Sequence, residues 1–319
     1  LGAVSLLPLL SLKQKKSEPV GKDAPTLEAP RLADLLPLAS IGPVSAPRRT
    51  EVLSRKDGRE ISFHYCVKVE QGQQIDERRE DLAISAGRAF KFILEQYPDD
   101  LVGALRQIYA ASEDEVSLDH VTDIVITYQC SGGQKHVYKA ILLDMDRRSV
   151  LEFGFFAAFK EVHGGKQLAH KETETLLRAL DSGVAPRFGC EFVLREVPGE
   201  GFVRVKTRDE GDAVFYVEEW IEGVEAAYLL KRNEFSQRHL RELVETVLGL
   251  GCYLTPAKDS VQLLLPRDLN TRNIMFRVGR NILGGIEYGR PVVVDFGQLS
   301  IRRPIAVIAA LMKYYGRPV

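Results

Sequence analysis

The sequence predicts an α+β fold for this chain of 319 residues. Apolar and polar residues alternate in 61–69, and β-branched and aromatic residues are concentrated in 121–128 and 214–217, which is typical of strands. Amphipathic helices are predicted for 75–96 and 235–253, where apolar side chains recur every three to four residues. The composition, 45% apolar and 27% charged, is that of a globular protein with enough apolar material for a core.

Charge and cysteine content exclude several functional classes. The formal net charge is −1, so no overall electric field favours binding to nucleic acid or to an anionic membrane. No apolar run approaches the roughly 20 residues of a membrane span. The four cysteines lie far apart and form no C-x-x-C pair, which argues against a zinc ribbon or a disulfide scaffold. We therefore expect a cytoplasmic protein that has no transmembrane segment and does not bind nucleic acid.

The first third of the chain is predicted to precede the functional part. Residues 1–58 are rich in Pro, Ser and Lys and show no sustained period, which is typical of an extended or disordered lead-in. Residues 59–115 are predicted to form a strand followed by helices. The sequence assigns no role to this helical extension, beyond the expectation that it packs against the part that follows.

Three polar residues in the last fifth of the chain suggest phosphoryl-transfer chemistry. Asp268 and Asn273 stand five residues apart in R-D-L-N-T-R-N, and Asp295 follows the apolar run 291–294 in D-F-G. Phosphoryl transfer from a nucleotide needs a carboxylate that orients the acceptor, a neutral oxygen ligand for magnesium, and a second carboxylate for the metal. A tight loop followed by a hairpin would place all three side chains around one phosphate.

The string R-D-L-x-x-x-N followed by D-F-G resembles the catalytic and metal-binding loops of the protein-kinase-like superfamily. This resemblance implies a bilobal α+β fold that uses ATP and Mg²⁺. It implies that Asp268 orients or deprotonates the acceptor hydroxyl, and that Asn273 and Asp295 hold magnesium across the phosphates. Arg272 resembles the arginine of the D-L-x-x-R-N loop in tyrosine kinases.

A glycine turn upstream resembles the glycine-rich loop of the same superfamily. Ser131, Gly132 and Gly133 lie between two predicted strands, and glycine allows a close approach to phosphates because it lacks a Cβ. The third glycine that is usual in this loop is replaced by Lys135. A plain β-hairpin would also explain the pattern.

The expected phosphate-binding lysine lies farther along the chain. Lys160 ends an apolar strand two strands after the glycine turn, which is where kinases place this residue. A surface lysine at the end of a strand is the alternative. Glu172, on the helix predicted for 167–181, is expected to pair with Lys160, and Glu174 is the competing choice.

The adenine-binding edge is expected after the strand 214–217. In the superfamily this strand leads into a hinge whose backbone groups hydrogen-bond the adenine. The corresponding residues here are Glu218, Glu219 and Trp220. Simple packing would explain Trp220 equally well.

Several features depart from the superfamily pattern. The histidine that usually precedes R-D is replaced by Pro266, and Asn270 replaces the lysine of protein Ser/Thr kinases. With 116–222 as the small lobe, 223–319 would form a large lobe with only 22 residues after D-F-G and no A-P-E string. We expect either a minimal fold, similar to bacterial kinase-like proteins and effector kinases, or a truncated chain.

The expected activity is ATP- and Mg²⁺-dependent transfer of a γ-phosphate to a hydroxyl. A protein hydroxyl is the first choice of acceptor, and a sugar or lipid-linked sugar is the alternative, because Asn at position 270 is reminiscent of lipopolysaccharide-sugar kinases. The second hypothesis is a pseudokinase, a nucleotide-binding interaction module without turnover. If the protein is an effector, we expect delivery to a host cytoplasm.

Overall fold

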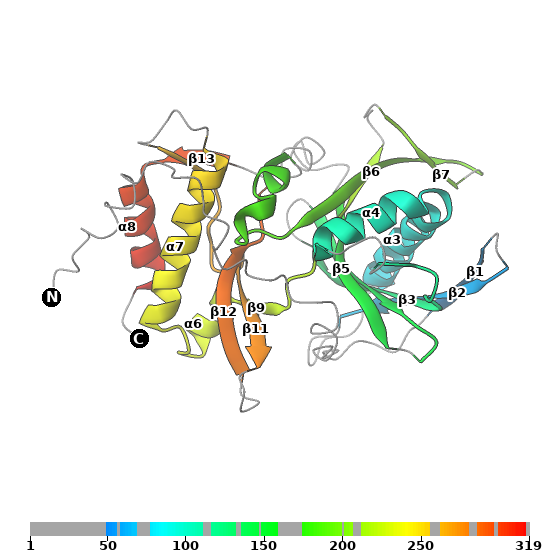
Figure 1. Cartoon of the computed structure of the whole chain (residues 1–319), viewed down its shortest axis with the longest axis horizontal. Coiled ribbons are helices and arrows are strands. Elements are labelled where there is room, and N and C mark those ends of the chain that lie inside the picture. The colour runs from blue at the N-terminus through cyan, green and yellow to red at the C-terminus, as the bar shows by residue number, and fades with distance from the viewer. Residues whose placement is uncertain are drawn as a thin grey trace, which may run out of the picture.

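The computed structural model shows a mixed α/β protein, which agrees with the predicted α+β class. One large sheet with two helices occupies one side of the molecule, and shorter strands with the remaining helices occupy the other (Figure 1). The structure describes residues 49–55, 58–68, 77–110, 116–131, 135–146, 148–158, 174–199, 201–206, 212–255, 262–280, 286–296 and 299–316.

The large sheet has eight strands in the order β1-β2-β3-β4-β5-β8-β6-β7. Neighbouring strands are antiparallel except for β2 and β3, which are parallel. The strands are β1 (Arg49–Ser54), β2 (Glu60–Val67), β3 (Asp123–Ser131), β4 (Lys135–Leu143), β5 (Ser149–Ala158), β6 (Phe188–Val197), β7 (Gly201–Arg204) and β8 (Ala213–Glu219). Residues 49–67, which the sequence assigned to the lead-in and to the extension that follows it, therefore contribute two strands to this sheet.

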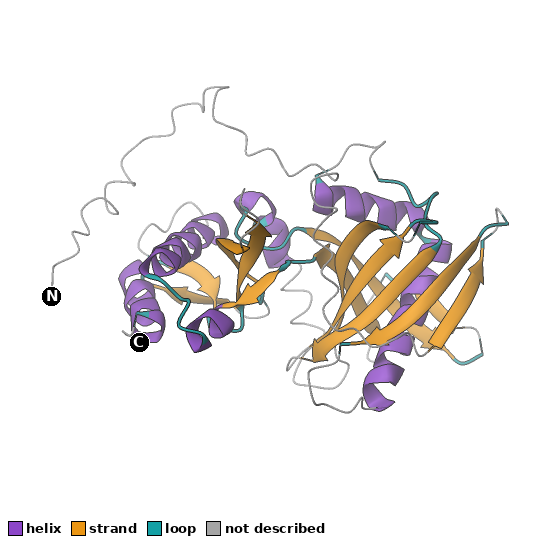
Figure 2. Ribbon diagram, turned by 90° about the horizontal axis from the view of Figure 1, so that it is seen from below, coloured by secondary structure: helices purple, strands orange, loops and turns teal. Residues whose placement is uncertain are grey.

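Helices α3 (Glu77–Gln96) and α4 (Pro98–Tyr109) pack against the large sheet (Figure 2). Phe90 of α3 is fully buried, and its ring centroid lies 5.6 Å from that of Phe153 and 5.3 Å from that of Phe155 in β5. These residues belong to a first hydrophobic cluster that extends from Leu53 to Val217. The helices and the sheet thus share one core.

The other face of β5 belongs to a second hydrophobic cluster. Successive side chains of a strand point to opposite faces, so Phe156 points away from Phe155. The Phe156 ring stacks on that of Tyr216 with centroids 5.1 Å apart. Both residues belong to the cluster that also contains Phe276 and Phe296. Strands β5, β6 and β8 of the large sheet therefore contribute buried residues to both cores.

The second part of the molecule combines short sheets with helices. Strand β10 pairs with β13, and β12-β11-β9 form a three-stranded sheet. These elements are β9 (Gly223–Glu225), α6 (Ala226–Lys231), α7 (Gln237–Leu254), β10 (Leu263–Pro266), β11 (Ile274–Arg280), β12 (Ile286–Val293), β13 (Leu299–Arg302) and α8 (Pro304–Tyr315). A 3₁₀ turn, η3 (Leu180–Ser182), leads from a helical segment at 174–178 towards β6.

Helix α7 begins with a capping box. The Ser236 hydroxyl accepts a hydrogen bond from the His239 backbone N–H, and the His239 ring accepts one from the Ser236 N–H. The helix buries one apolar side, including Leu243, Val247 and Leu250, as its sequence periodicity predicts.

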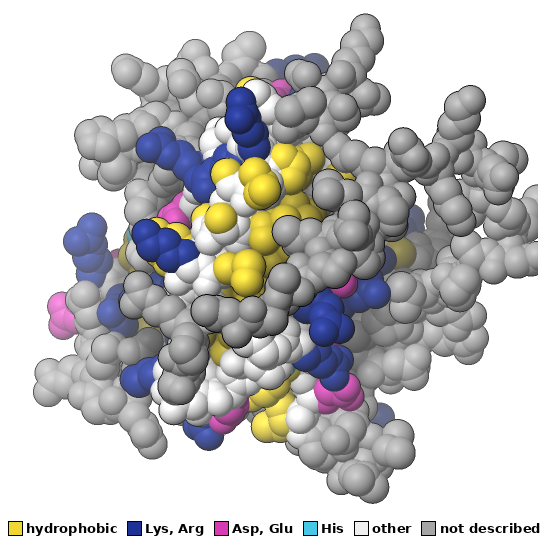
Figure 3. All heavy atoms as spheres, turned by 90° about the vertical axis from the view of Figure 1, so that its left-hand side faces the viewer, with side chains coloured by type: hydrophobic (Ala, Val, Ile, Leu, Met, Phe, Trp, Pro, Cys, Tyr) yellow, Lys and Arg dark blue, Asp and Glu magenta, His cyan; other side chains and the backbone are white. Residues whose placement is uncertain are grey.

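Apolar side chains remain exposed at one end of the molecule. Ile301 of β13 and Ile305 and Met312 of α8 are all more than half exposed. Figure 3 shows apolar side chains gathered on this side. Within the described residues, no helix has the length and apolar character needed to cross a bilayer.

Candidate functional site

The loop between β10 and β11 is shaped by Asn270. Its side-chain Oδ1 accepts hydrogen bonds from the backbone N–H groups of Arg272, at 2.7 Å, and Asn273, at 3.1 Å. Its Nδ2 donates to the Asp268 carboxylate at 2.8 Å. An Asn side chain that bonds backbone N–H groups two and three residues ahead stabilises a turn. Asn270 thus fixes the loop and orients Asp268, a role that the sequence did not reveal.

Asn273 links the two predicted aspartates, through the backbone of Asp268 and the carboxylate of Asp295. Its Nδ2 donates to the backbone oxygen of Asp268, at 3.0 Å, and to Oδ2 of Asp295, at 3.3 Å. Asp295 lies 22 residues farther along the chain. The hairpin explains the meeting, because Ile274 of β11 pairs with Val293 of β12. The Val294 N–H also donates to the Asn273 backbone oxygen at 3.0 Å.

The charged side chains of this cluster are accessible, whereas their apolar neighbours are buried. Asp268 is exposed, and Asp295 is half-buried. Their neighbours Ile274, Val293 and Phe296 are almost completely buried in the second hydrophobic cluster. The apolar residues therefore fix the backbone, and the carboxylates remain able to reach a ligand.

Helix α8 contacts the backbone of the loop between β10 and β11. The Tyr315 hydroxyl donates to the backbone oxygen of Leu269 at 3.3 Å. Burial and then the nearby Asp268 carboxylate raise the pKa of Tyr315 above its usual range, so this hydroxyl keeps its proton. Arg302 of β13 also donates to the backbone oxygen of Arg267, at 2.8 Å. Strand β13 and helix α8 thus hold the loop between β10 and β11 in place.

Arg272 lies in the same loop with an exposed side chain. Its backbone N–H is held by Asn270. The preceding residue, Thr271, accepts a hydrogen bond from the Ala227 N–H at 2.9 Å, which ties the loop to the start of α6. The Arg272 guanidinium therefore projects from a well-anchored stretch of backbone.

The predicted adenine edge lies where β8 ends. Glu218 is almost completely buried. The Glu219 carboxylate accepts from the Arg187 N–H at 3.1 Å and pairs with the Arg277 guanidinium at 2.8 Å. It therefore joins the start of β6 to β11, so its side chain has a connecting role. Trp220 is half-buried beside it.

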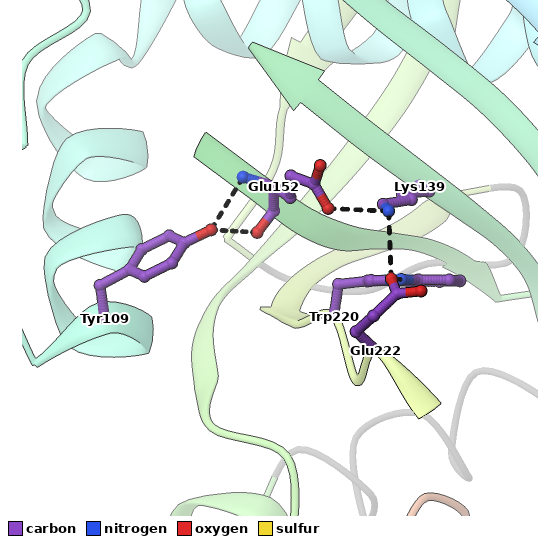
Figure 4. Close-up of polar contacts among 5 residues, drawn as sticks. All are labelled: Tyr109, Lys139, Glu152, Trp220 and Glu222. Carbon is purple, nitrogen blue, oxygen red and sulfur yellow. Dashed lines mark hydrogen bonds and ion pairs between the residues drawn. The ribbon is translucent and has the colours of Figure 1, made fainter. Parts of the chain in front are cut away.

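Trp220 belongs to a polar network that the sequence did not predict (Figure 4). Its indole N–H donates to Glu222 at 3.2 Å, and the Lys139 ammonium lies 5.5 Å from the Trp220 ring centroid. Lys139 also pairs with Glu152 at 2.7 Å and with Glu222 at 3.4 Å. Tyr109 of α4 hydrogen-bonds the Glu152 backbone. The network therefore connects α4 through β5 and β4 to the segment that follows β8.

Ser131 is the part of the glycine turn that the structure describes. Its exposed hydroxyl lies 2.6 Å from the Tyr128 hydroxyl and 2.6 Å from Nδ1 of His136. Burial, and then the positive charge of Arg78, lowers the pKa of His136 to about 4. The ring is therefore neutral at pH 7.

Four predicted site residues lie outside the described residues. They are Gly132, Gly133, Lys160 and Glu172. The alternative to Glu172, Glu174, is exposed at the start of the helical segment 174–178. The structure thus brings together Asp268, Asn273 and Asp295, and it places Glu218, Glu219 and Trp220 in a separate strand end.

The polar cluster fits a magnesium ion that is shared with a substrate. Among the described residues, no group of three or more His, Cys, Asp or Glu side chains is arranged to hold a metal alone. Mg²⁺ prefers oxygen ligands and is usually bound by one or two carboxylates together with substrate phosphates. Asp295 offers a carboxylate, and Asn273 offers its Oδ1 because Nδ2 is engaged with Asp268 and Asp295.

Comparisons with known proteins give no family assignment for the chain. Function is therefore inferred from the group of Asp268, Asn273 and Asp295, called the Asn273 cluster from here on, and from the order of the elements along the chain. No protein-family model matches the sequence, and no curated protein matches it significantly.

Proposed function

We propose that the protein is an ATP- and Mg²⁺-dependent phosphotransferase of the protein-kinase-like type, which transfers the γ-phosphate to a hydroxyl. The observation that carries this proposal is that the Asn273 amide donates both to the backbone oxygen of Asp268 and to the carboxylate of Asp295. It joins the three residues that phosphoryl transfer requires, although one of them is remote in sequence.

The order of the elements supports the same proposal. Strands β3 and β4 pair antiparallel on either side of the sequence Gly132-Gly133, and β5, β6 and β8 lie in the same sheet. The long helix α7 precedes the loop, and the β11–β12 hairpin ends immediately before Asp295. This is the succession of elements that the resemblance to the superfamily implies.

The residues of the cluster have separate chemical tasks. Asp268 is exposed and would accept or orient the proton of the acceptor hydroxyl. Asn273 and Asp295 would hold magnesium, which when bound neutralises negative charge on the β- and γ-phosphates. Arg272, exposed in the same loop, would attract the acceptor or its developing negative charge.

The acceptor is proposed to be a protein hydroxyl, with a sugar hydroxyl as the alternative. Both substrates present an alcohol to Asp268, so the same chemistry serves either one. Incubation with labelled ATP, Mg²⁺ and either a peptide library or a panel of sugars would separate them. Label in peptides but not in sugars is the expected result.

Mutation of the two carboxylates tests the mechanism. Asp268→Ala should lower label incorporation by about 100-fold or more, since general-base contributions are typically of that size. Asp295→Ala should remove incorporation because magnesium loses its carboxylate. Asp146→Ala, an exposed aspartate in the turn before β5, is the matched control and should retain wild-type incorporation. Retention of label in both site variants would refute the proposal.

A nucleotide-binding module without turnover is the second candidate. The observation that favours it is Pro266, which stands at the buried end of β10 where the superfamily usually has a histidine. A proline has no N–H and no ring nitrogen to hydrogen-bond the loop. Thermal stabilisation by ATP in the absence of any labelled product would favour this candidate.

A further inference from the structure

Lys135 begins β4 directly after the glycine turn. It stands at the position where the glycine-rich loop of the protein-kinase-like superfamily usually has a third glycine. Its side chain is half-buried, and its ammonium lies 5.0 Å from the ring centroid of Phe156 and 5.5 Å from that of Tyr216. Two aromatic rings from neighbouring strands thus position this cation.

These rings show which face of the sheet Lys135 occupies. Phe156 and Tyr216 belong to the second hydrophobic cluster, together with Phe296, the residue after Asp295. Val137, two residues after Lys135 and therefore on the same face, also packs against this cluster. The Lys135 ammonium therefore lies on the face of the sheet that meets the part carrying the Asn273 cluster, and not on the face that α3 covers.

The strand register relates Lys135 to the lysine predicted from sequence. Lys135 pairs with Ala158, the last residue of β5. Lys160 comes two residues later in the chain, beyond the end of this strand. Lys135 therefore lies beside the end of β5, on the neighbouring strand of the sheet.

The aromatic contacts suit a binding role. A cation over an aromatic face is attracted by the ring electrons, and this contact restricts the side chain while the ammonium keeps its charge. A lysine ammonium has three donors and binds phosphate oxygens as a point charge. Backbone N–H groups of a glycine turn are a second common source of phosphate contacts.

We propose that Lys135, the first residue of β4, binds the phosphates of the nucleotide as a positioning cation. This inference rests on the proposed function, because it requires a nucleoside triphosphate between the sheet and the Asn273 cluster. It predicts that the positive charge at position 135 is needed for the phosphates and not for the nucleoside.

Equilibrium binding tests the inference without reference to turnover. Affinities of wild type and Lys135→Met for adenosine, ADP and ATP would be measured with Mg²⁺ by calorimetry or by displacement of a fluorescent nucleotide. Met keeps an unbranched apolar side chain over the two rings. We expect ATP affinity to fall about 10-fold or more, a loss typical of a charge-assisted contact, and adenosine affinity to stay unchanged.

Two further variants separate charge from structure. Lys135→Arg keeps the positive charge and should recover most of the ATP affinity, even if Lys135→Met lowers the thermal stability. Lys91→Met removes another half-buried lysine, on α3, whose ammonium donates to the Val52 backbone oxygen. This control should leave the difference between ATP and adenosine at the wild-type value.

The outcomes separate this inference from the proposed function. If wild type binds ATP more tightly than adenosine and Lys135→Met preserves that difference, the inference is refuted and the phosphotransferase proposal stands. Loss of the difference in Lys160→Met but not in Lys135→Met would likewise overturn it. If wild type binds none of the three ligands, both proposals fail.

Discussion

At the scale of single residues, Asn270 shows how one side chain organises the candidate site. Its carbonyl oxygen accepts from two backbone N–H groups, and its amide donates to Asp268. The spacing of Asp268 and Asn273 predicted both as site residues. Asn270 was interpreted only as an indication of the acceptor class. Its role could not be derived from the motif, because it depends on the turn that the backbone adopts.

Substitution of Asn270 should separate stability from activity. Asn270→Ala removes three hydrogen bonds and should lower the free energy of unfolding by about 1–3 kcal/mol, measured by urea denaturation. Asn270→Asp keeps an oxygen for the two N–H groups and should recover most of this loss. It also places a second negative charge beside Asp268, so phosphoryl transfer should remain impaired. Wild-type stability in Asn270→Ala would contradict this account of the loop.

His136 should make stability depend on pH. Burial lowers its pKa from 6.5 to about 4 in the folded protein, so the unfolded chain binds a proton that the folded one refuses. The free energy of unfolding is therefore highest above about pH 6.5. It decreases as the pH falls towards 4, because the unfolded chain takes up the proton first. After allowance for solvent screening, we expect about 1 kcal/mol from this residue. Urea unfolding at pH 7.5, 6 and 5 should show a smaller pH dependence in His136→Gln than in wild type.

At the scale of elements, periodicity predicted most helices and strands that the structure describes. The helix expected at 75–96 is α3 (Glu77–Gln96), and the one expected at 235–253 is α7 (Gln237–Leu254). Both are confirmed because an amphipathic pattern is a local property of the chain. Short elements that form only by pairing with another strand carry no comparable pattern. Strand β9 is one of them, and it was missed.

Strand β9 depends on a glycine that lets two backbones meet. Gly223 pairs with Arg277 of β11, and a Cβ added to Gly223 would lie 2.4 Å from the Phe276 carbonyl oxygen. Gly223→Ala should therefore force the strands apart and cost about 1–3 kcal/mol. Gly249→Ala, in α7 where no described residue outside the adjacent helix backbone comes within 4 Å of the added Cβ, should instead stabilise by about 0.5–1 kcal/mol. Thermal unfolding of both variants checks the opposite signs.

At the scale of the whole molecule, the two hydrophobic clusters are joined by the strands that they share. Phe155 and Phe156 are adjacent in β5 but belong to different clusters. A backbone hydrogen bond from Val293 to Val184, at 3.0 Å, also joins β12 to the segment before β6. A substitution that disrupts either core should therefore also destabilise the other core.

This sharing predicts a single cooperative unfolding transition. Phe155→Ala should lower the free energy of unfolding by about 3–5 kcal/mol, as is typical for truncation of a buried aromatic residue. Phe156→Ala, on the opposite face, should cause a loss of similar size. The only tryptophan, Trp220, lies beyond the end of β8, so its fluorescence and far-UV circular dichroism should change together. Separate transitions in either variant would show that the clusters unfold independently.

The sequence by itself determined the secondary structure that follows from local patterns and the identity of the Asp268, Asn273 and Asp295 cluster. Spacing within a short loop and an apolar run before D-F-G are properties of neighbouring residues, so they can be read without coordinates. Only the tertiary structure decided that β8 lies between β5 and β6, that Tyr315 supports the loop, and that Lys135 faces the second cluster. These features depend on hydrogen bonds and packing between segments remote in sequence, and no local pattern specifies which segments will meet.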